Sequence, residues 1–303
     1  MNKKGLLLVF ITAIISGFSI FINKYGVGGV NPYLFAFLKN VMVALAFSGF
    51  VLLAKEWRQL AKLTKKQWLM LLVIGFVGGG AAFLLFFKGL SITSAAQGSF
   101  IHKTMFIYTM ILASIFLREK IRKEMLIGAL MILAGNLIAL KALHLSFNRG
   151  DFYVFLATLL WAVESVISKY ALAGLSPKIV AWGRMFFGAI LILIFLAGSG
   201  QLTIISQLNF EQVFWIQIAS FILFGYVITW YSGLRHIPVS TAAAILLLGS
   251  PITTLLAFAS TGKINFGEIV SSGLITGGLI MILGYRFILE KIKLLGEKIN
   301  VRA

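Results

Sequence analysis

The apolar residues of this chain occur in long runs that short polar segments separate. A run of about 18 or more mainly apolar residues is long enough to cross a bilayer as an α-helix. Such runs recur along the whole chain, and their number predicts ten membrane-spanning helices. The predicted spans are residues 5–23, 33–54, 68–87, 95–117, 125–143, 152–172, 178–197, 212–232, 240–260 and 267–289.

The polar segments between these runs are too short to form a soluble domain. The first run follows Lys3 and Lys4, as in a signal peptide, but it has no clear small-residue cleavage pattern, so we expect a retained helix. The two longest polar stretches, residues 55–66 and 290–303, alternate Lys or Arg with apolar residues. We expect both stretches to lie along the membrane surface.

Composition supports the same fold class, an all-α integral membrane protein. Of the 303 residues, 60% are hydrophobic, and the mean hydropathy is +0.99. A soluble protein of this size could not cover so much apolar surface. The absence of cysteine excludes disulfides and thiolate chemistry. The net charge of +18 lies mostly in short loops, so it indicates membrane topology and a lipid bilayer as partner, and no nucleic acid.

The loop charges also predict the orientation of the chain. If the N-terminus is cytoplasmic, most basic loop residues fall on the cytoplasmic side, and the other side receives only Lys24, Lys88, Lys141, Arg149 and Lys263. Cytoplasmic loops of membrane proteins carry an excess of Lys and Arg. We therefore expect a multi-pass protein of the cell (inner, cytoplasmic) membrane with both termini in the cytoplasm.

The sequence of one segment between the first two spans recurs between the sixth and seventh spans, with the same spacing between the matching residues. The matching residues are Lys24, Tyr25, Gly29, Pro32, Ala36 and Lys39 in the first copy, and Lys169, Tyr170, Gly174, Pro177, Ala181 and Arg184 in the second. An odd number of spans separates the copies, which predicts two inverted five-helix repeats. The predicted units are residues 1–143, a linker 144–151, residues 152–289 and a cytoplasmic tail 290–303.

Four charged residues fall well inside the predicted spans, away from their ends: Lys39, Lys103, Glu164 and Arg184. A charge near the centre of a membrane helix costs roughly 2.5–3.5 kcal/mol, so such residues normally face a cavity or a partner. Helix geometry places Lys103 roughly 12 Å and Glu164 roughly 18 Å from the same membrane face. Together they could bind a zwitterion, and Glu164 could carry a coupling proton. The alternative is a permanent structural ion pair.

The other marked positions have weaker functional signals. His102 could relay protons, although an isolated histidine is more often structural. Lys39 and Arg184 occupy equivalent repeat positions, which favours a shared structural role over solute binding. Pro251 lies inside the ninth predicted span and predicts a break in that helix.

The chain shows no pattern of a metalloenzyme or an ATP-driven pump. No His, Cys, Asp or Glu cluster has metal-site spacing, and no phosphate-binding Gly-Lys-Ser/Thr loop occurs. No convincing pair of acidic residues for acid–base catalysis emerges either. We therefore expect no enzyme activity, no metal and no cofactor.

Short motifs near the fourth and ninth spans add a family resemblance. The first half contains Gly89-Leu90 followed by Ser94-Ala95-Ala96. The second half contains the matching Gly233-Leu234 followed by Ser240 and Thr241. Glu119 follows the fourth span and precedes Gly128 and Gly135, whereas residues 261–264 of the second half contain no matching Glu. With the repeated segments that end at Pro32 and Pro177, the chain resembles ten-helix EamA-type permeases of the drug/metabolite transporter superfamily.

The resemblance implies alternating-access transport of small polar metabolites, often amino acids or related compounds, and we expect an exporter. It also implies a central cavity that would include Ser19, Asn23, Gln97, His102, Lys103, Trp161, Glu164 and Trp230. Protons are a possible coupling ion. Two other hypotheses remain: a non-transporting membrane protein that acts on or with lipid-linked substrates, as an enzyme or flippase subunit, and a passive channel.

Overall fold

The computed structural model confirms an all-α protein in the residues that it describes. These are residues 2–121, 123–142, 147–202 and 208–249, and in the last part 252–253, 255–256, 259, 266–267, 269–282 and 284. The predicted helix break at Pro251 and the whole predicted tail, residues 290–303, lie outside this set. Every regular element within it is helical.

The helices follow the predicted spans closely. They are α1 (Lys3–Gly28), α2 (Pro32–Leu53), α3 (Trp57–Leu60), α4 (Lys65–Ile74), α5 (Ala82–Ile92), α6 (Ala95–Lys103), α7 (Met105–Phe116), α8 (Lys123–Ala142), α9 (Arg149–Ala171), α10 (Pro177–Gly198), α11 (Phe210–Leu234) and α12 (Val239–Ile245). A π-helical segment, η1 (Gly75–Ala81), joins α4 to α5, and a 3₁₀ turn, η3 (Leu246–Leu248), follows α12.

Among the described residues, seven helical stretches are long and apolar enough to cross a membrane: Lys3–Gly28, Pro32–Leu53, Lys65–Ile92, Gln97–Phe116, Arg149–Ala171, Pro177–Gly198 and Phe210–Leu234. They match the first four predicted spans and the sixth to eighth. Helix α8 occupies the fifth, and the shorter apolar helices Val239–Leu248 and Ile269–Ile282 occupy the ninth and tenth. The protein is therefore an α-helical membrane protein that crosses the bilayer several times.

Polar side chains fix where several helices begin. Helices α2 and α10 start at Pro32 and Pro177, where a missing backbone N–H costs nothing. The preceding Asn31 and Ser176 accept hydrogen bonds from backbone N–H groups of the first turn. The repeated segments therefore end in helix N-termini of the same kind.

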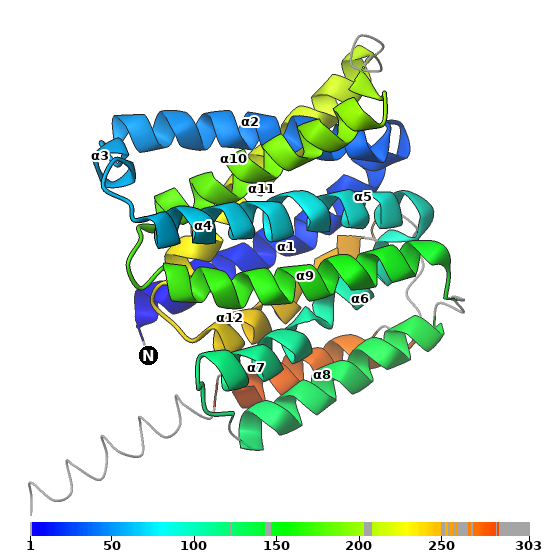
Figure 1. The fold of residues 1–303 in the computed structure, drawn as a ribbon. Helices are drawn as coiled ribbons and strands as arrows, with labels where there is room; N and C mark the ends of the chain where they lie inside the picture. The colour runs from blue at the N-terminus through cyan, green and yellow to red at the C-terminus, as the bar shows by residue number, and fades with distance from the viewer. Residues whose placement is uncertain are drawn as a thin grey trace, which may run out of the picture.

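Packing between the two halves of the chain is also repeated. Helix α1 packs against α11, and α5 packs against α9. These are equivalent contacts, because α9 is the second-half equivalent of α1 and α11 is that of α5. Helix α2 contacts its equivalent α10, and α7 of the fourth span contacts α12 of the ninth, the equivalent span of the second half. In Figure 1 these helices form one bundle, with α2 at its upper edge and α8 at its lower edge. The bundle core is where helices from both halves meet.

The repeated lysines Lys24 and Lys169 bind backbone carbonyls at the C-terminal ends of equivalent helices. Lys24 Nζ donates to the carbonyls of Leu90 (2.8 Å) and Thr93 (2.6 Å), at the end of α5. Lys169 Nζ donates to the carbonyls of Leu234 (2.7 Å) and Ile237 (2.8 Å), at the end of α11. The last carbonyls of a helix lack partners within it, and a cation there is favourable. The repeat marks these lysines, but only the structure shows their role.

Glu119, part of the motif after the fourth span, binds the start of α12. Its Oε1 accepts from the N–H of Val239 (2.8 Å), and its Oε2 accepts from the N–H (3.0 Å) and hydroxyl (2.5 Å) of Ser240. The carboxylate thus satisfies two N–H groups that have no partner within the helix.

Replacing Glu119 by Ala should lower the free energy of unfolding by about 1–2 kcal/mol, the usual value of a helix cap. The measurement is thermal unfolding of the detergent-purified protein. Glu211→Ala is the matched control, because Glu211 is exposed in the first turn of α11. Equal stability of the two variants would mean that the Glu119 contacts do not stabilise the fold.

Candidate functional site

A cavity lies at the centre of the bundle. Helices α1, α2, α5, α6, α7, α9, α10 and α11 all contribute to its wall. The lining residues are Ser16, Ser19, Ile20, Asn23, Lys39, Phe83, Phe86, Phe87, His102, Met105, Trp161, Glu164, Ser165, Arg184, Leu223, Tyr226 and Trp230. The wall therefore combines aromatic rings with hydroxyl groups and three residues of formal charge.

Glu164 is the acidic residue of this wall. Its side chain comes from α9 and is 1% exposed. Its Oε1 accepts hydrogen bonds from the hydroxyls of Tyr231 (2.5 Å) and Ser168. Among the described residues, Oε2 has no hydrogen-bond partner. Glu164 is thus held in place through one oxygen, which leaves the other available.

Arg184 enters the same cavity from α10. Its Nη2 donates a long hydrogen bond of 3.4 Å to the carbonyl of Gly78, and its guanidinium lies 5.9 Å from the ring centre of Tyr231. Its Nε has no hydrogen-bond partner in the described residues. Within the described residues, no ion pair joins Arg184 to Glu164. The cavity therefore holds opposite charges that are not paired with each other.

Lys39 supplies a second cation from α2. Its Nζ donates to Asn23 Oδ1 (2.7 Å) and lies 4.6 Å from the ring centre of Phe87. Asn23 in turn donates to the hydroxyl of Ser19 (3.0 Å). Lys39, Asn23 and Ser19 form one polar chain along the wall of α1 and α2. A cation over an aromatic face is stabilised electrostatically, so Lys39 can remain without an acidic partner.

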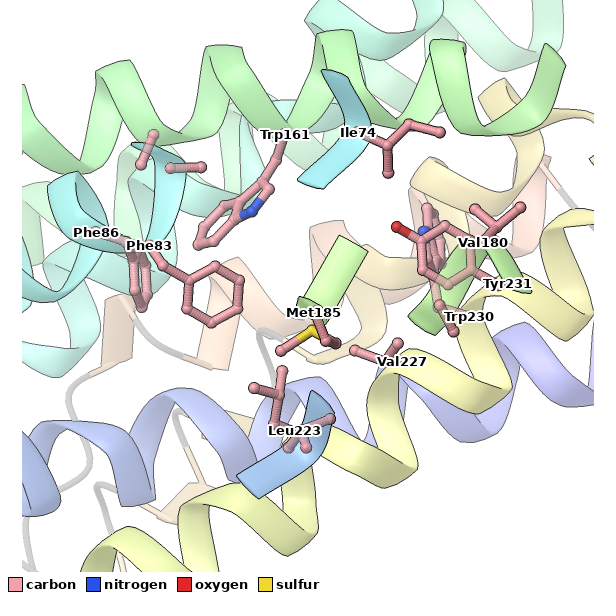
Figure 2. Close-up of a cluster of buried hydrophobic side chains, with 14 of the residues drawn as sticks. Ile74, Phe83, Phe86, Trp161, Val180, Met185, Leu223, Val227, Trp230 and Tyr231 are labelled. Carbon is pink, nitrogen blue, oxygen red and sulfur yellow. The ribbon is translucent and has the colours of Figure 1, made fainter. Parts of the chain in front are cut away.

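Aromatic rings form the rest of the wall. The ring of Trp161 lies 5.6 Å from that of Phe83, 5.0 Å from that of Phe86 and 5.1 Å from that of His102. Figure 2 shows Trp161, Phe83 and Phe86 together, with Trp230 and Tyr231 farther along the cluster. Trp230 stacks on Tyr226 at 6.3 Å. A ligand in the cavity would meet apolar faces between the charged groups.

The glycines of η1 allow charged and aromatic side chains to share one backbone carbonyl. Gly78 O accepts from Trp161 Nε1 (2.8 Å) as well as from Arg184. A Cβ atom on Gly78 would lie 2.2 Å from Glu164 Cγ. Helix α9 can therefore approach η1 only because no side chain is present. π-Helical segments are rare and frequently lie at functional sites.

Most of the expected site residues meet at this cavity. Ser19, Asn23, His102, Trp161, Glu164 and Trp230 line it, whereas Lys103 and Gln97 do not. Gln97 instead donates to Asp151 Oδ2 (2.6 Å) near the start of α9. Lys39 and Arg184, for which we expected a structural role, both line the cavity.

Two hydroxyl residues of the wall, Ser16 and Ser165, were not identified from the sequence. Both carry a helical spacing signal that could have found them. Ser16 lies three and seven residues before Ser19 and Asn23 on one face of α1, and Ser165 lies four residues after Trp161. Among the described residues, no three His, Cys, Asp or Glu side chains gather where they could hold a metal ion.

Comparison with known proteins gives concordant results. The sequence model of the EamA-like transporter family matches residues 3–141 and again residues 148–284. The uncharacterized transporter YyaM of Bacillus subtilis (strain 168) is 27% identical over 87% of this chain and 90% of its own length. An uncharacterized transporter of Archaeoglobus fulgidus is 25% identical over 95% of this chain and 99% of its own.

A solved structure supports the fold alone. It has a TM-score of 0.74 at 16% sequence identity, and the match covers 96% of this chain and all of the other.

Proposed function

Because the chain belongs to the EamA-like transporter family, and is therefore a membrane transporter and not an enzyme, we propose that it moves amino-acid-like solutes. In this proposal the chain is a secondary transporter that exports small polar metabolites by alternating access. The observation that carries the proposal is the Glu164 carboxylate, which forms no ion pair within the described residues, in one cavity with the Arg184 and Lys39 cations.

Unpaired opposite charges in a membrane-embedded cavity favour a zwitterionic ligand. An isolated charge away from water is costly unless a partner and hydrogen bonds satisfy it. An α-amino acid supplies both missing partners at once. Its ammonium group would bind Glu164, and its carboxylate would bind Arg184, with Lys39 as a second cation.

The remaining wall residues support a solute with an apolar or aromatic side chain. Trp161, Phe86 and Trp230 present ring faces or edges that can stack on another ring or bury a methylene chain. Ser19 and Asn23 supply further hydrogen-bonding groups. His102 packs against Trp161 and Phe86, whose rings also contact each other, and this favours a contact role over proton relay.

Orientation and coupling are part of the same proposal. The excess of basic residues in one set of loops supports cytoplasmic termini. Glu164 is the acidic lining residue of the described cavity, so it is the group that we assign to any coupled proton. A proton would compete there with the ammonium group of the solute.

The proposal predicts saturable counterflow of an amino acid in liposomes that contain only the purified protein. Vesicles loaded with unlabelled amino acid should accumulate the labelled form without ATP. Two matched probes test the charge pattern: the amino alcohol, which lacks the carboxylate, and the carboxylic acid, which lacks the amine. We expect each to compete at least about 10-fold more weakly, because each leaves one buried charge unpaired.

Other outcomes would identify the alternatives. Flux that neither saturates nor shows counterflow would indicate a channel. Flux only in the presence of a second protein would indicate a flippase subunit. A thermal-shift screen identifies the solute class first, because a ligand that binds the folded form raises the unfolding midpoint.

A further inference from the structure

Among the described residues, Lys103 is the buried cation that does not line the cavity. It is the last residue of α6 and is 2% exposed. Its Nζ donates to Ser16 Oγ in α1 (2.9 Å) and to the carbonyl of Leu246 (3.1 Å). His102, one position earlier, lines the cavity. The side chains of His102 and Lys103 therefore make different contacts: His102 lines the cavity, and Lys103 binds Ser16 and Leu246.

Both ends of this contact lie where a membrane span is interrupted. Thr104 separates α6 from α7 within the fourth span, directly after Lys103. Leu246 opens the 3₁₀ turn η3 that follows α12 in the ninth span. Helices α7 and α12 also pack against each other. Lys103 thus connects the interruptions of two spans that occupy equivalent places in the two halves.

Helix α1 packs directly on the same interruption. A Cβ atom on Gly249 would lie 2.8 Å from both Ala13 O and Lys103 Nζ. Thr253 Oγ1 donates to the carbonyls of Gly17 (2.9 Å) and Gly249 (3.0 Å). These contacts leave no space for a side chain between α1 and the ninth span. Lys103 completes the contact by binding Ser16, a cavity residue.

We propose that Lys103 is a positioning residue that holds the cavity wall of α1 to the interruption of the ninth span, so that the two move together. Its ammonium group satisfies the carbonyl of Leu246 at the end of α12, where a cation is favourable. The equivalent residue of the second half is Leu247, which is buried in an apolar cluster with Phe106 and Met110. The connection is therefore made once, and it distinguishes the two halves.

The absence of cysteine allows a direct test. Ser19→Cys places a reporter on the cavity face of α1, and Ser165→Cys places a second reporter on α9, to which Lys103 donates no hydrogen bond within the described residues. Maleimide labelling rates are measured in membrane vesicles with Lys103 intact and with Lys103→Met. Because interhelical hydrogen bonds in membranes have modest strength, we expect the Ser19→Cys rate to change about threefold or more. The Ser165→Cys rate should stay constant.

A second variant guards against misfolding. Ser16→Ala removes the α1 partner alone, so it should change the Ser19→Cys rate in the same direction, and adding Lys103→Met should have little further effect. If neither substitution changes that rate, or if both reporters change equally, the proposal is wrong. This labelling needs no solute, so it stands apart from the proposed function. Once a solute is known, Lys103→Met should alter the turnover rate and leave KM unchanged, whereas loss of a solute ligand would raise KM.

Discussion

Replacing Glu164 by Gln should weaken binding of an amino-acid solute by about 100-fold or more, because it leaves the ammonium group of the solute without an anionic partner in a buried site. The substitution preserves the shape of the side chain. The amide oxygen of glutamine can still accept hydrogen bonds from Tyr231 and Ser168. A loss would therefore report the missing charge and not a collapsed wall. The measurement is the dissociation constant from ligand-dependent thermal stability, together with the initial rate of counterflow.

Tyr231→Phe is the matched control for the position of Glu164. It removes the 2.5 Å hydrogen bond to Oε1 but keeps the carboxylate and the ring that packs near Arg184. A hydrogen bond to a charged group contributes about 1.5–3 kcal/mol to stability, but Glu164 keeps its charge and the Ser168 hydrogen bond, so we expect binding to weaken by only roughly 5-fold. If Glu164→Gln binds the amino acid as tightly as the unchanged protein, Glu164 does not bind the ammonium group. Unchanged binding with slower proton-driven transport would restrict Glu164 to coupling.

The sequence predicts the helical spans well because hydropathy is their physical cause. Every backbone polar group of a span must be satisfied within the chain, so long apolar runs have few alternatives to a helix. Hydropathy contains no information on hydrogen-bond register, however. The π-helical segment Gly75–Ala81 and the interruption at Thr104 therefore appear only in the structure.

The residues that line the cavity were predicted in part, and the differences between expectation and structure have identifiable causes. His102 and Lys103 are consecutive, and nothing in their sequence shows which of them faces the cavity. Lys39 and Arg184 are equivalent in the repeat, which we interpreted as a sign of a structural role. Two inverted halves bring equivalent positions to one central cavity, so equivalence does not separate binding residues from structural ones.

Replacing Gly79 by Ala should produce the largest loss of stability among these variants. A Cβ atom on Gly79 would lie 1.9 Å from Arg184 O, and one on Gly188 would lie 2.4 Å from Gly79 C. The backbones of η1 and α10 are therefore in direct contact, and neither can accept a methyl group without separating. Asn40 also donates to Gly79 O (2.5 Å), so this separation would break a buried hydrogen bond.

Overpacking of a tight contact costs about 1–3 kcal/mol and sometimes more, and we expect Gly79→Ala to exceed about 3 kcal/mol because backbone atoms cannot rotate away. Gly49→Ala is the matched control. Gly49 lies inside α2, and a Cβ atom there would meet nothing within 4 Å, so alanine should stabilise the helix by up to about 1 kcal/mol. Thermal unfolding of both purified variants gives the comparison. Separation of η1 from α10 would also displace Arg184 from the cavity, so a Gly79→Ala protein that still folds should bind solute weakly. If the two glycine variants are equally stable, the close approach that places Arg184 beside Gly78 does not exist.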